Sequence, residues 1–359
     1  MPAGSNVTRA PASGAPVPAT SPLRTATAHT LYPGLLAASL VATLVGVRQG
    51  FDPTLVVMST IFLAAIPQLI AQRLMPYEQE WAAAPKHYAL DLLHMASTGL
   101  TTEGWRALTL GALVWGAGAL TDAVGASLWP GWMPWWAQFA LAMLVGDFGA
   151  YWVHRSCHRY ELLWRVHAMH HSSDRLYMLS GGRNHPFNAI LAYGSQLLPL
   201  TLLGAPVEII ALMSVFTGVN GMLQHANIDL RHGVLNHVFA TADLHRWHHA
   251  TRREDSDTNF GSNLILWDWV FRTRHLPADR EIRDVGLPDL DLPENFLHHL
   301  ASPFNLNQWL VEVSKGTPMS APVRAFMGHA EPELAPQTVP ALACVEEEEV
   351  AEAEPTKSK

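Results

Sequence analysis

Four long apolar runs in the first half of the chain constrain its fold more than any other feature. They cover residues 31–47, 54–71, roughly 106–121 and 135–153, and each is bounded by proline, glycine or charged residues. A membrane-spanning helix needs about 20 predominantly apolar residues, so these runs can cross a bilayer if they are tilted or thinly flanked. Helices of a soluble bundle would normally show a polar face, which the runs lack. The sequence therefore predicts an all-α integral membrane protein with about four transmembrane helices.

The composition agrees with a membrane protein and excludes other classes. Only 15% of the 359 residues are charged, against about 25% in soluble domains, while 49% are hydrophobic and 13 are tryptophan. The net charge of −8 comes partly from the acidic C-terminal end, and no basic stripe is present, so nucleic-acid binding is not expected. The two cysteines, Cys157 and Cys344, lie far apart and outside any CxxC pattern, which excludes a disulfide framework.

We divide the chain into five parts. Residues 1–29 are rich in Ala, Pro, Ser and Thr and are expected to form a disordered tail. A transit peptide has a compatible composition, but the prolines would break its amphipathic helix. The expected parts that follow are N-terminal transmembrane helices (30–134), a histidine-rich catalytic region (135–275), a cytoplasmic C-terminal segment (276–330) and an acidic disordered tail (331–359).

The distribution of basic residues predicts the orientation in the membrane. Lys and Arg precede the first run and follow the second and fourth, whereas residues 121–134 contain neither. Because Lys and Arg are enriched in cytoplasmic loops, both termini and the histidine-rich segments are expected in the cytoplasm, with Arg48 as the exception. A further apolar region, 185–225, breaks at 204–206 and is expected to form a helical hairpin, since histidine motifs flank both of its ends.

Three histidine clusters are the strongest candidate for chemistry: HRSCH (154–158), HAMHH (167–171) and HRWHH (245–249). Residues three and four apart share one face of an α-helix, so the imidazoles of each cluster project together. One metal ion needs about four to six ligands, and eight histidines therefore indicate two ions. Imidazole suits zinc, iron, copper and nickel alike. The eight candidate ligands are His154, His158, His167, His170, His171, His245, His248 and His249.

The carboxylates of two known classes of metalloenzyme are missing from these clusters. A metalloprotease of the HExxH type needs a glutamate between its histidines as a general base, and no glutamate lies there. Soluble di-iron bundles use a Glu-x-x-His pattern, which is also absent from the clusters. Neutral imidazoles leave the full charge on the ions, which favours the activation of a small molecule such as water, hydroxide or oxygen.

Residues 140 to 275 resemble the fatty acid hydroxylase and sterol desaturase superfamily of membrane-bound di-iron oxygenases. The resemblance rests on the order HxxxH, HxxHH, HxxHH and on the segments GDFGAYWVHRSCH, RNHP, QHANI and DSDTNFGSNLILWDW. It implies that the eight histidines bind two iron ions at the cytoplasmic end of a helical bundle, with O₂ as co-substrate and a lipid as substrate. The sequence has no flavin or nicotinamide fingerprint, so the electrons are expected to come from a separate reductase.

The resemblance also points to residues around the clusters. Some members supply another histidine pair between the second and third clusters, and His225 is expected to be a ninth ligand. Asp229 stands where the second histidine of that pair would lie, which leaves the ligand count open. A ligating imidazole usually donates its other N–H to a carboxylate or carbonyl, and helix capping or turn formation is the alternative for such residues. Candidates for these supporting contacts are His185, Asp257, Asn259 and Asp268.

Four further residues have expected positions. Asp147 is costly in lipid and is expected to face the site or another polar group. Cys157 is expected to be a small buried residue and not a ligand, because nothing pairs with it. His298 and His299 are expected at the surface.

The sequence thus predicts a membrane-bound, O₂-dependent di-iron hydroxylase that acts on a fatty acyl or sterol-like C–H bond. A desaturase or carotenoid oxygenase of the same superfamily is the nearest alternative. A non-catalytic, histidine-rich metal-binding membrane protein is disfavoured, because the ligands of a transporter should line the membrane spans, whereas these clusters follow them. The oligomeric state is left open.

Overall fold

The computed structural model describes residues 21–82, 85–288, 290 and 292–305. Within these residues the chain forms α-helices and short 3-10 helices, and its only β pairing is two isolated bridges, so the all-α prediction is confirmed. The acidic tail expected at 331–359 and residues 1–20 lie outside the described residues. Helix α1 begins at Pro22, so the boundary expected at residue 29 lies inside a helix. The Ser21 side chain caps this helix by accepting from the backbone N–H of Arg24.

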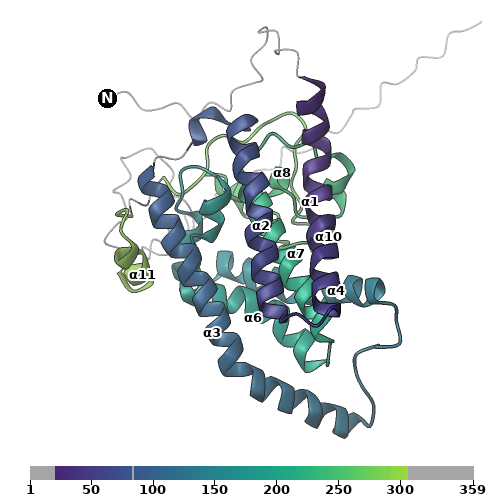
Figure 1. Ribbon diagram of the computed structural model, residues 1–359. Helices are drawn as coiled ribbons and strands as arrows, with labels where there is room; N and C mark the ends of the chain where they lie inside the picture. The colour runs from purple at the N-terminus through teal and green to yellow at the C-terminus, as the bar shows by residue number, and fades with distance from the viewer. Residues whose placement is uncertain (1–20, 83–84, 289, 291, 306–359) are drawn as a thin grey trace, which may run out of the picture.

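Seven long helices and four short ones build the described fold, joined by three 3-10 turns (Figure 1). The long helices are α1 (Pro22–Arg48), α2 (Pro53–Leu74), α3 (Pro85–Val124), α4 (Trp135–Arg159), α5 (Glu161–His171), α6 (Pro186–Leu202) and α7 (Val207–His225). The short elements are η1 (Gln79–Trp81), η2 (Met178–Gly182), η3 (Gly233–His237), α8 (Ala242–His248), α9 (Arg253–Ser256), α10 (Leu266–Val270) and α11 (Phe296–Asn305).

Four helices are long and apolar enough to cross a membrane: α1, α2, α3 from His87 to Val124, and α7. The expected number of spans is therefore confirmed, but two of the expected spans need correction. The third helix begins well before the run at 106–121. The run at 135–153 is not among the four, because Gln138 and Asp147 are buried polar residues that lower its mean hydropathy.

Large apolar side chains cover the outer surface of α1, α2 and α3. Phe62, Leu108 and Trp115 are 72%, 77% and 77% exposed. Soluble monomers rarely expose apolar patches of this extent, whereas a bilayer solvates such a surface. The protein is therefore a multi-pass membrane protein.

Helix α7 lies at the centre of the bundle, where α1, α2 and α4 pack against it, while α6 lies between α3 and α4 (Figure 1). The α6–α7 pair is the expected helical hairpin, with a turn at Gly204. Helices α4 and α6 approach so closely that a Cβ atom at Gly149 would lie 2.3 Å from the carbonyl oxygen of Ser195. A small residue at this position is what permits such a crossing between membrane helices.

Loop contacts place the start of α1 and the end of α2 at the same end of the bundle as the chain that follows α7. The N–H of Asp229 donates to the carbonyl of Met75 at 2.9 Å, and that of Arg231 donates to Ala28 at 2.8 Å. At the opposite end, Arg48 forms a salt bridge of 3.0 Å with Glu208 at the start of α7. This ion pair accounts for the basic residue that the orientation rule left as an exception.

Candidate metal centre

All nine predicted histidine ligands lie at one end of the bundle. They come from the last turns of α4 and α7, from the C-terminal half of α5, and from α8 together with the residue that caps it. The residues are His154 and His158 on α4, His167, His170 and His171 on α5, His225 on α7, and His245, His248 and His249 on or beside α8.

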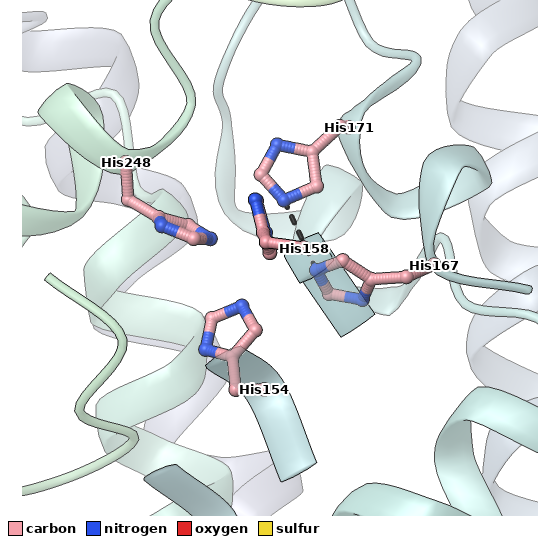
Figure 2. A group of neighbouring side chains, drawn as sticks. All are labelled: His154, His158, His167, His171 and His248. Carbon is pink, nitrogen blue, oxygen red and sulfur yellow. Dashed lines mark hydrogen bonds between the residues drawn. The ribbon is translucent and has the colours of Figure 1, made fainter. Parts of the chain in front are cut away.

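The nine histidines form two groups that differ from the three clusters in the sequence. Helices α5 and α8 each contribute to both groups, because two histidines four residues apart enter one group and the remaining histidine enters the other. Within each group the ring nitrogens lie within 4.8 Å of one another. Group A is His154, His158, His167, His171 and His248, drawn in Figure 2, and group B is His170, His225, His245 and His249.

The ring nitrogens at the centre of each group fit metal ions. Opposed nitrogens lie 3.1 Å apart between His171 and His167, and 3.0 Å apart between His249 and His245. Two nitrogens bound at about 2.1 Å and at right angles to one ion would be separated by about 3.0 Å. Several other ring nitrogens are buried without a protein partner in the described part of the chain, a costly state that a metal would relieve. They are Nε2 of His154, His158 and His248 and Nδ1 of His170.

Five of the histidines have their Nδ1 atoms held by protein acceptors. A metal-ligating imidazole commonly donates its other N–H to a carboxylate or carbonyl, which fixes the tautomer and the orientation of the ring. Four of these contacts support group A and one supports group B. The pairs are His154 with Phe260 O at 2.9 Å, His158 with Asp257 Oδ1 at 3.2 Å, His167 with Asn188 Oδ1 at 3.1 Å, His248 with Thr258 O at 2.8 Å, and His225 with Gly221 O at 3.0 Å.

Of the four residues expected to support the ligands, Asp257 contacts one directly, and Asn188 is a supporting residue that the sequence reasoning missed. Asn188 lies on α6, far from the clusters in the sequence, and donates through Nδ2 to Asn184 Oδ1 at 2.7 Å. The pair Asn184 and Asn188, one helical turn apart around the start of an apolar helix, is the only sequence signal that could have indicated this role. Helix packing, which no sequence pattern specifies, brings Asn188 to His167.

The other three candidates occupy structural positions. His185 caps α6 by accepting from Phe187 N at 3.2 Å, and its other ring nitrogen contacts Leu300 O at 3.1 Å, so both nitrogens are engaged away from the two groups. Asn259 adopts a left-handed conformation with φ of 54° and ties α8 to the chain near residue 275. Asp268 accepts from the N–H groups of Phe260 and Gly261 and so holds the segment whose carbonyl contacts His154.

The burial and polar contacts of three more residues bear on the expectations for them. Asp147 is fully buried and accepts from Asn263 Nδ2 and N, both at 2.9 Å, so it faces another polar group as expected. Cys157 is buried with 1% exposure, as expected. Asp229 pairs with Arg231 at 3.3 Å and belongs to neither histidine group. Of the histidine pair found in some family members, this chain therefore places only His225 in group B.

Burial keeps six of the cluster imidazoles in their neutral form. Removal from water disfavours the charged imidazolium, and the neighbouring histidines add to this effect. Only neutral imidazole can bind a metal, so the site is prepared for ligation at pH 7. The pKa lies well below the usual value for His167, His170, His171, His245, His248 and His249.

We expect Gly181→Ala to displace the His225 ring and to lower the metal content of group B. A Cβ atom at Gly181 would lie 2.8 Å from Nδ1 and 2.9 Å from Cγ of His225, closer than real contacts. Gly221→Ala is the matched control, because a Cβ there meets nothing within 4 Å and the carbonyl that His225 uses stays in place. Elemental analysis of the purified variants measures the effect, and equal metal content in the two would contradict this account.

This chain matches one family model and is similar to several known proteins. The fatty acid hydroxylase model matches residues 139–273. The ornithine lipid hydroxylase OlsE of Rhizobium tropici is 33% identical over 291 residues, which is 79% of this chain and 86% of that protein. The human alkylglycerol monooxygenase is 30% identical over 44% of this chain, and the Delta(7)-sterol-C5(6)-desaturase of Nicotiana tabacum is 29% identical over 43%.

The extent of these matches differs. The chain spans 35% of the human alkylglycerol monooxygenase and 56% of the tobacco desaturase, whereas the match to the Rhizobium tropici protein covers most of both chains. No solved structure is significantly similar to the chain. The family match includes all nine grouped histidines and the elements that carry them. The chain therefore belongs to the fatty acid hydroxylase and sterol desaturase superfamily and is an oxidoreductase.

Proposed function

We propose that this protein is a membrane-bound, O₂-dependent lipid hydroxylase whose two histidine groups each hold one iron ion. The observation that carries the proposal is the pair of adjacent buried groups, in which facing ring nitrogens contact one another and Nε2 of His154, His158 and His248 has no protein partner among the described residues. The groups meet where the rings of His171 and His249 stack with centroids 4.3 Å apart. The residues that would hold the two ions therefore adjoin one another.

The protein itself supplies position and exclusion of water. Group A and group B would hold the irons, and the two ions would provide the reductive activation of O₂ that hydroxylation of an unreactive C–H bond requires. Asp257 and Asn188 fix the imidazoles of His158 and His167 by hydrogen bonds. The surrounding helices bury the ligands, which keeps the rings neutral and limits competing reactions with water.

Hydroxylation is favoured over desaturation because the relative that covers most of this chain is named a hydroxylase. The match to the sterol desaturase is shorter on both chains. Storage of metal is disfavoured, because five imidazoles are oriented by specific acceptors, as a reaction centre with fixed geometry requires. The substrate is proposed to be a lipid with a fatty acyl or sterol-like C–H bond, and a separate reductase is proposed as the electron source.

Isotope labelling tests the proposed reaction. Cells that express the protein under ¹⁸O₂ should contain a lipid heavier by one ¹⁸O atom, and cells without the protein should lack it. Lipid mass spectrometry reads both this shift and the loss of two hydrogens that desaturation would cause. Loss of two hydrogens without ¹⁸O would replace hydroxylation by desaturation, and the absence of both changes would refute the oxygenase.

We also propose that the histidine groups and both termini face the cytoplasm. The contacts of Asp229 and Arg231 place the start of α1 and the end of α2 at the histidine end of the bundle. Reporter fusions after Arg73 and Ser172 should therefore report the cytoplasm, and a fusion at Gly125, beyond the end of α3, should report the opposite side. A cytoplasmic signal from Gly125 would contradict this orientation.

A further inference from the structure

A second cluster of buried polar residues lies beside the histidine groups, around a pocket of about 320 Å³. The pocket lies between the start of α3, the end of α5, the residues after η2 and the segment that leads into α11. His299, expected at the surface, is 1% exposed here and contacts His94 of α3 at 2.9 Å, because α11 folds back onto α3. His298 is exposed, as expected. The proposed reaction assigns no role to this pocket.

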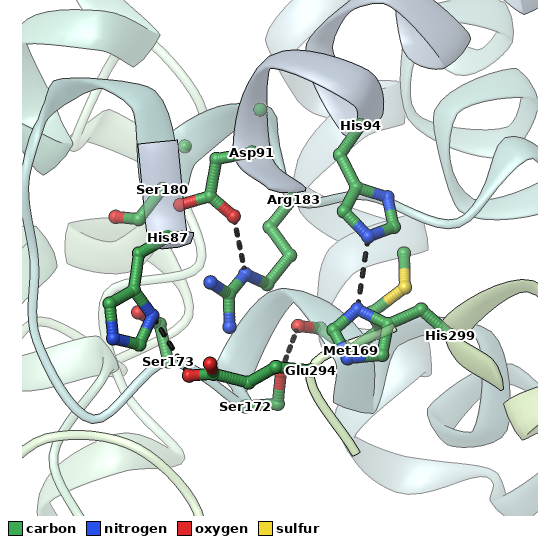
Figure 3. Close-up of polar contacts among 12 residues, drawn as sticks. His87, Asp91, His94, Met169, Ser172, Ser173, Ser180, Arg183, Glu294 and His299 are labelled. Carbon is green, nitrogen blue, oxygen red and sulfur yellow. Dashed lines mark hydrogen bonds and ion pairs between the residues drawn. The ribbon is translucent and has the colours of Figure 1, made fainter. Parts of the chain in front are cut away.

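Arg183 is the cation of the pocket. The residue is 5% exposed, and its Nε donates to Asp91 Oδ1 at 2.7 Å. The second oxygen of Asp91 accepts from the hydroxyl of Tyr177, so the carboxylate is fully used and holds the guanidinium in one orientation. Its two terminal nitrogens have no hydrogen-bond acceptor in the described part of the chain, and Figure 3 shows them directed toward the side of Glu294 and Ser172. A fixed, buried guanidinium fork binds a carboxylate or phosphate with two parallel hydrogen bonds.

Negative charge lies elsewhere on the wall of the same pocket. Glu294 lines it and contacts His87 Nδ1 at 2.9 Å, and Asp174 lines it and pairs with Arg175 at 2.8 Å. The Arg183–Asp91 and Arg175–Asp174 charges cancel, so the carboxylate of Glu294 remains on the wall opposite the guanidinium of Arg183. A group that carries both an anion and an ammonium matches both signs on the wall.

The pocket and the histidine groups are formed by adjoining segments of the chain. Ser172, which lines the pocket, directly follows His171 of group A on the last turn of α5. Gly181, two residues before Arg183, lies so close to His225 of group B that a Cβ atom there would be 2.8 Å from Nδ1 of the ring. A headgroup held here would therefore be anchored next to both groups, and its lipid chain would be confined to their neighbourhood.

We propose that this pocket binds the zwitterionic headgroup of the lipid substrate, with its anionic group on the Arg183 fork and its ammonium at Glu294. The proposal rests on the proposed lipid hydroxylase, since it assigns the substrate class of that site. The pocket volume is at the lower end of small-molecule sites and suits a compact headgroup. A carboxylate from an amino-acid headgroup and a phosphate from a phosphoethanolamine headgroup offer the same chemistry to the fork.

Four amphiphiles with the same 12-carbon acyl chain separate these possibilities. N-lauroyl-ornithine carries carboxylate and ammonium, lauroyl-lysophosphatidylethanolamine carries phosphate and ammonium, N-lauroyl-norvaline carries only the carboxylate, and N-lauroyl-1,4-diaminobutane carries only the ammonium. Binding to the metal-loaded protein is measured by titration calorimetry in a non-ionic detergent, with empty micelles as the blank. At least one zwitterion should bind about tenfold or more tightly than either singly charged amphiphile, and the better zwitterion identifies the anion.

Variants connect that preference to the residues. Arg183→Gln should lose the preference for zwitterion over the ammonium-only amphiphile, and Glu294→Gln should lose the preference over the carboxylate-only amphiphile. Arg165→Gln is the matched control, because Arg165 lies on α5 and pairs with Glu161 at 2.7 Å outside the pocket. Iron content should be unchanged in all three. If Arg183→Gln fails to fold, Glu294→Gln alone decides.

Equal binding of the four amphiphiles by the wild type would overturn the proposal, as would a full preference retained in Glu294→Gln. The binding assay needs no turnover, so its failure is separate from failure of the labelling experiment. A preference for zwitterions without ¹⁸O incorporation would support the headgroup pocket and reject the hydroxylase. Incorporation of ¹⁸O without a preference for zwitterions would support the hydroxylase and reject the headgroup pocket.

Discussion

His171→Ala in group A and His249→Ala in group B should each abolish formation of the oxidised lipid. Loss of a residue that only supports a metal ligand typically costs 10- to 100-fold in activity, so loss of a ligand should cost more than about 100-fold. The two rings stack against each other across the boundary between the groups, so each change removes one side of a shared site. Lipid mass spectrometry measures product, and elemental analysis measures iron.

The same variants separate catalysis from storage. If the two groups act as one reaction centre, the double variant should be no worse than either single variant, because each single change already removes the function. His298→Ala is the control, since His298 is exposed and belongs to neither group. A stepwise fall in iron with product formation in proportion to the iron that remains would contradict a shared centre.

The metal-free protein should lose thermal stability steeply as the pH falls from 7 to 5. The folded state keeps the pKa of His167, His171 and His248 well below the usual value, mainly through burial. The unfolded chain therefore binds more protons below pH 6.5, which lowers the free energy of unfolding. The slope approaches about 1.4 kcal/mol per pH unit for each such histidine, and a few of them match a typical total stability of about 5–15 kcal/mol.

Thermal unfolding of the metal-free protein in detergent at pH 7, 6 and 5 measures this effect. Iron binds only the neutral rings, so the loaded protein should remain stable to lower pH and then lose its metal and its stability together. His298→Ala is again the control, because His298 is exposed and belongs to neither group. A melting temperature that stays constant from pH 7 to pH 5 would show that the groups are not buried as described.

The membrane helices show how far hydropathy alone predicts this fold. Apolar length identified α1, α2 and the α6–α7 hairpin, because a bilayer requires continuous apolar helices whatever their packing. It placed the third span at 106–121 although α3 begins at Pro85, and it chose the run that contains Asp147 over α7. Asp147 is accommodated only because Asn263 and its neighbours donate to it from a distant segment. Such compensation is a property of the packed bundle.

For the metal centre too, some features could be predicted from the sequence and others only from the tertiary structure. The nine histidines followed from the sequence, because their spacing puts them on shared helix faces and a family resemblance added His225. Only the tertiary structure decided that α5 and α8 each serve both groups, that Asn188 holds His167, and that Arg183 faces a pocket beside them. The reason is that helical periodicity determines which residues share a face, whereas the angle and distance between helices determine which faces meet.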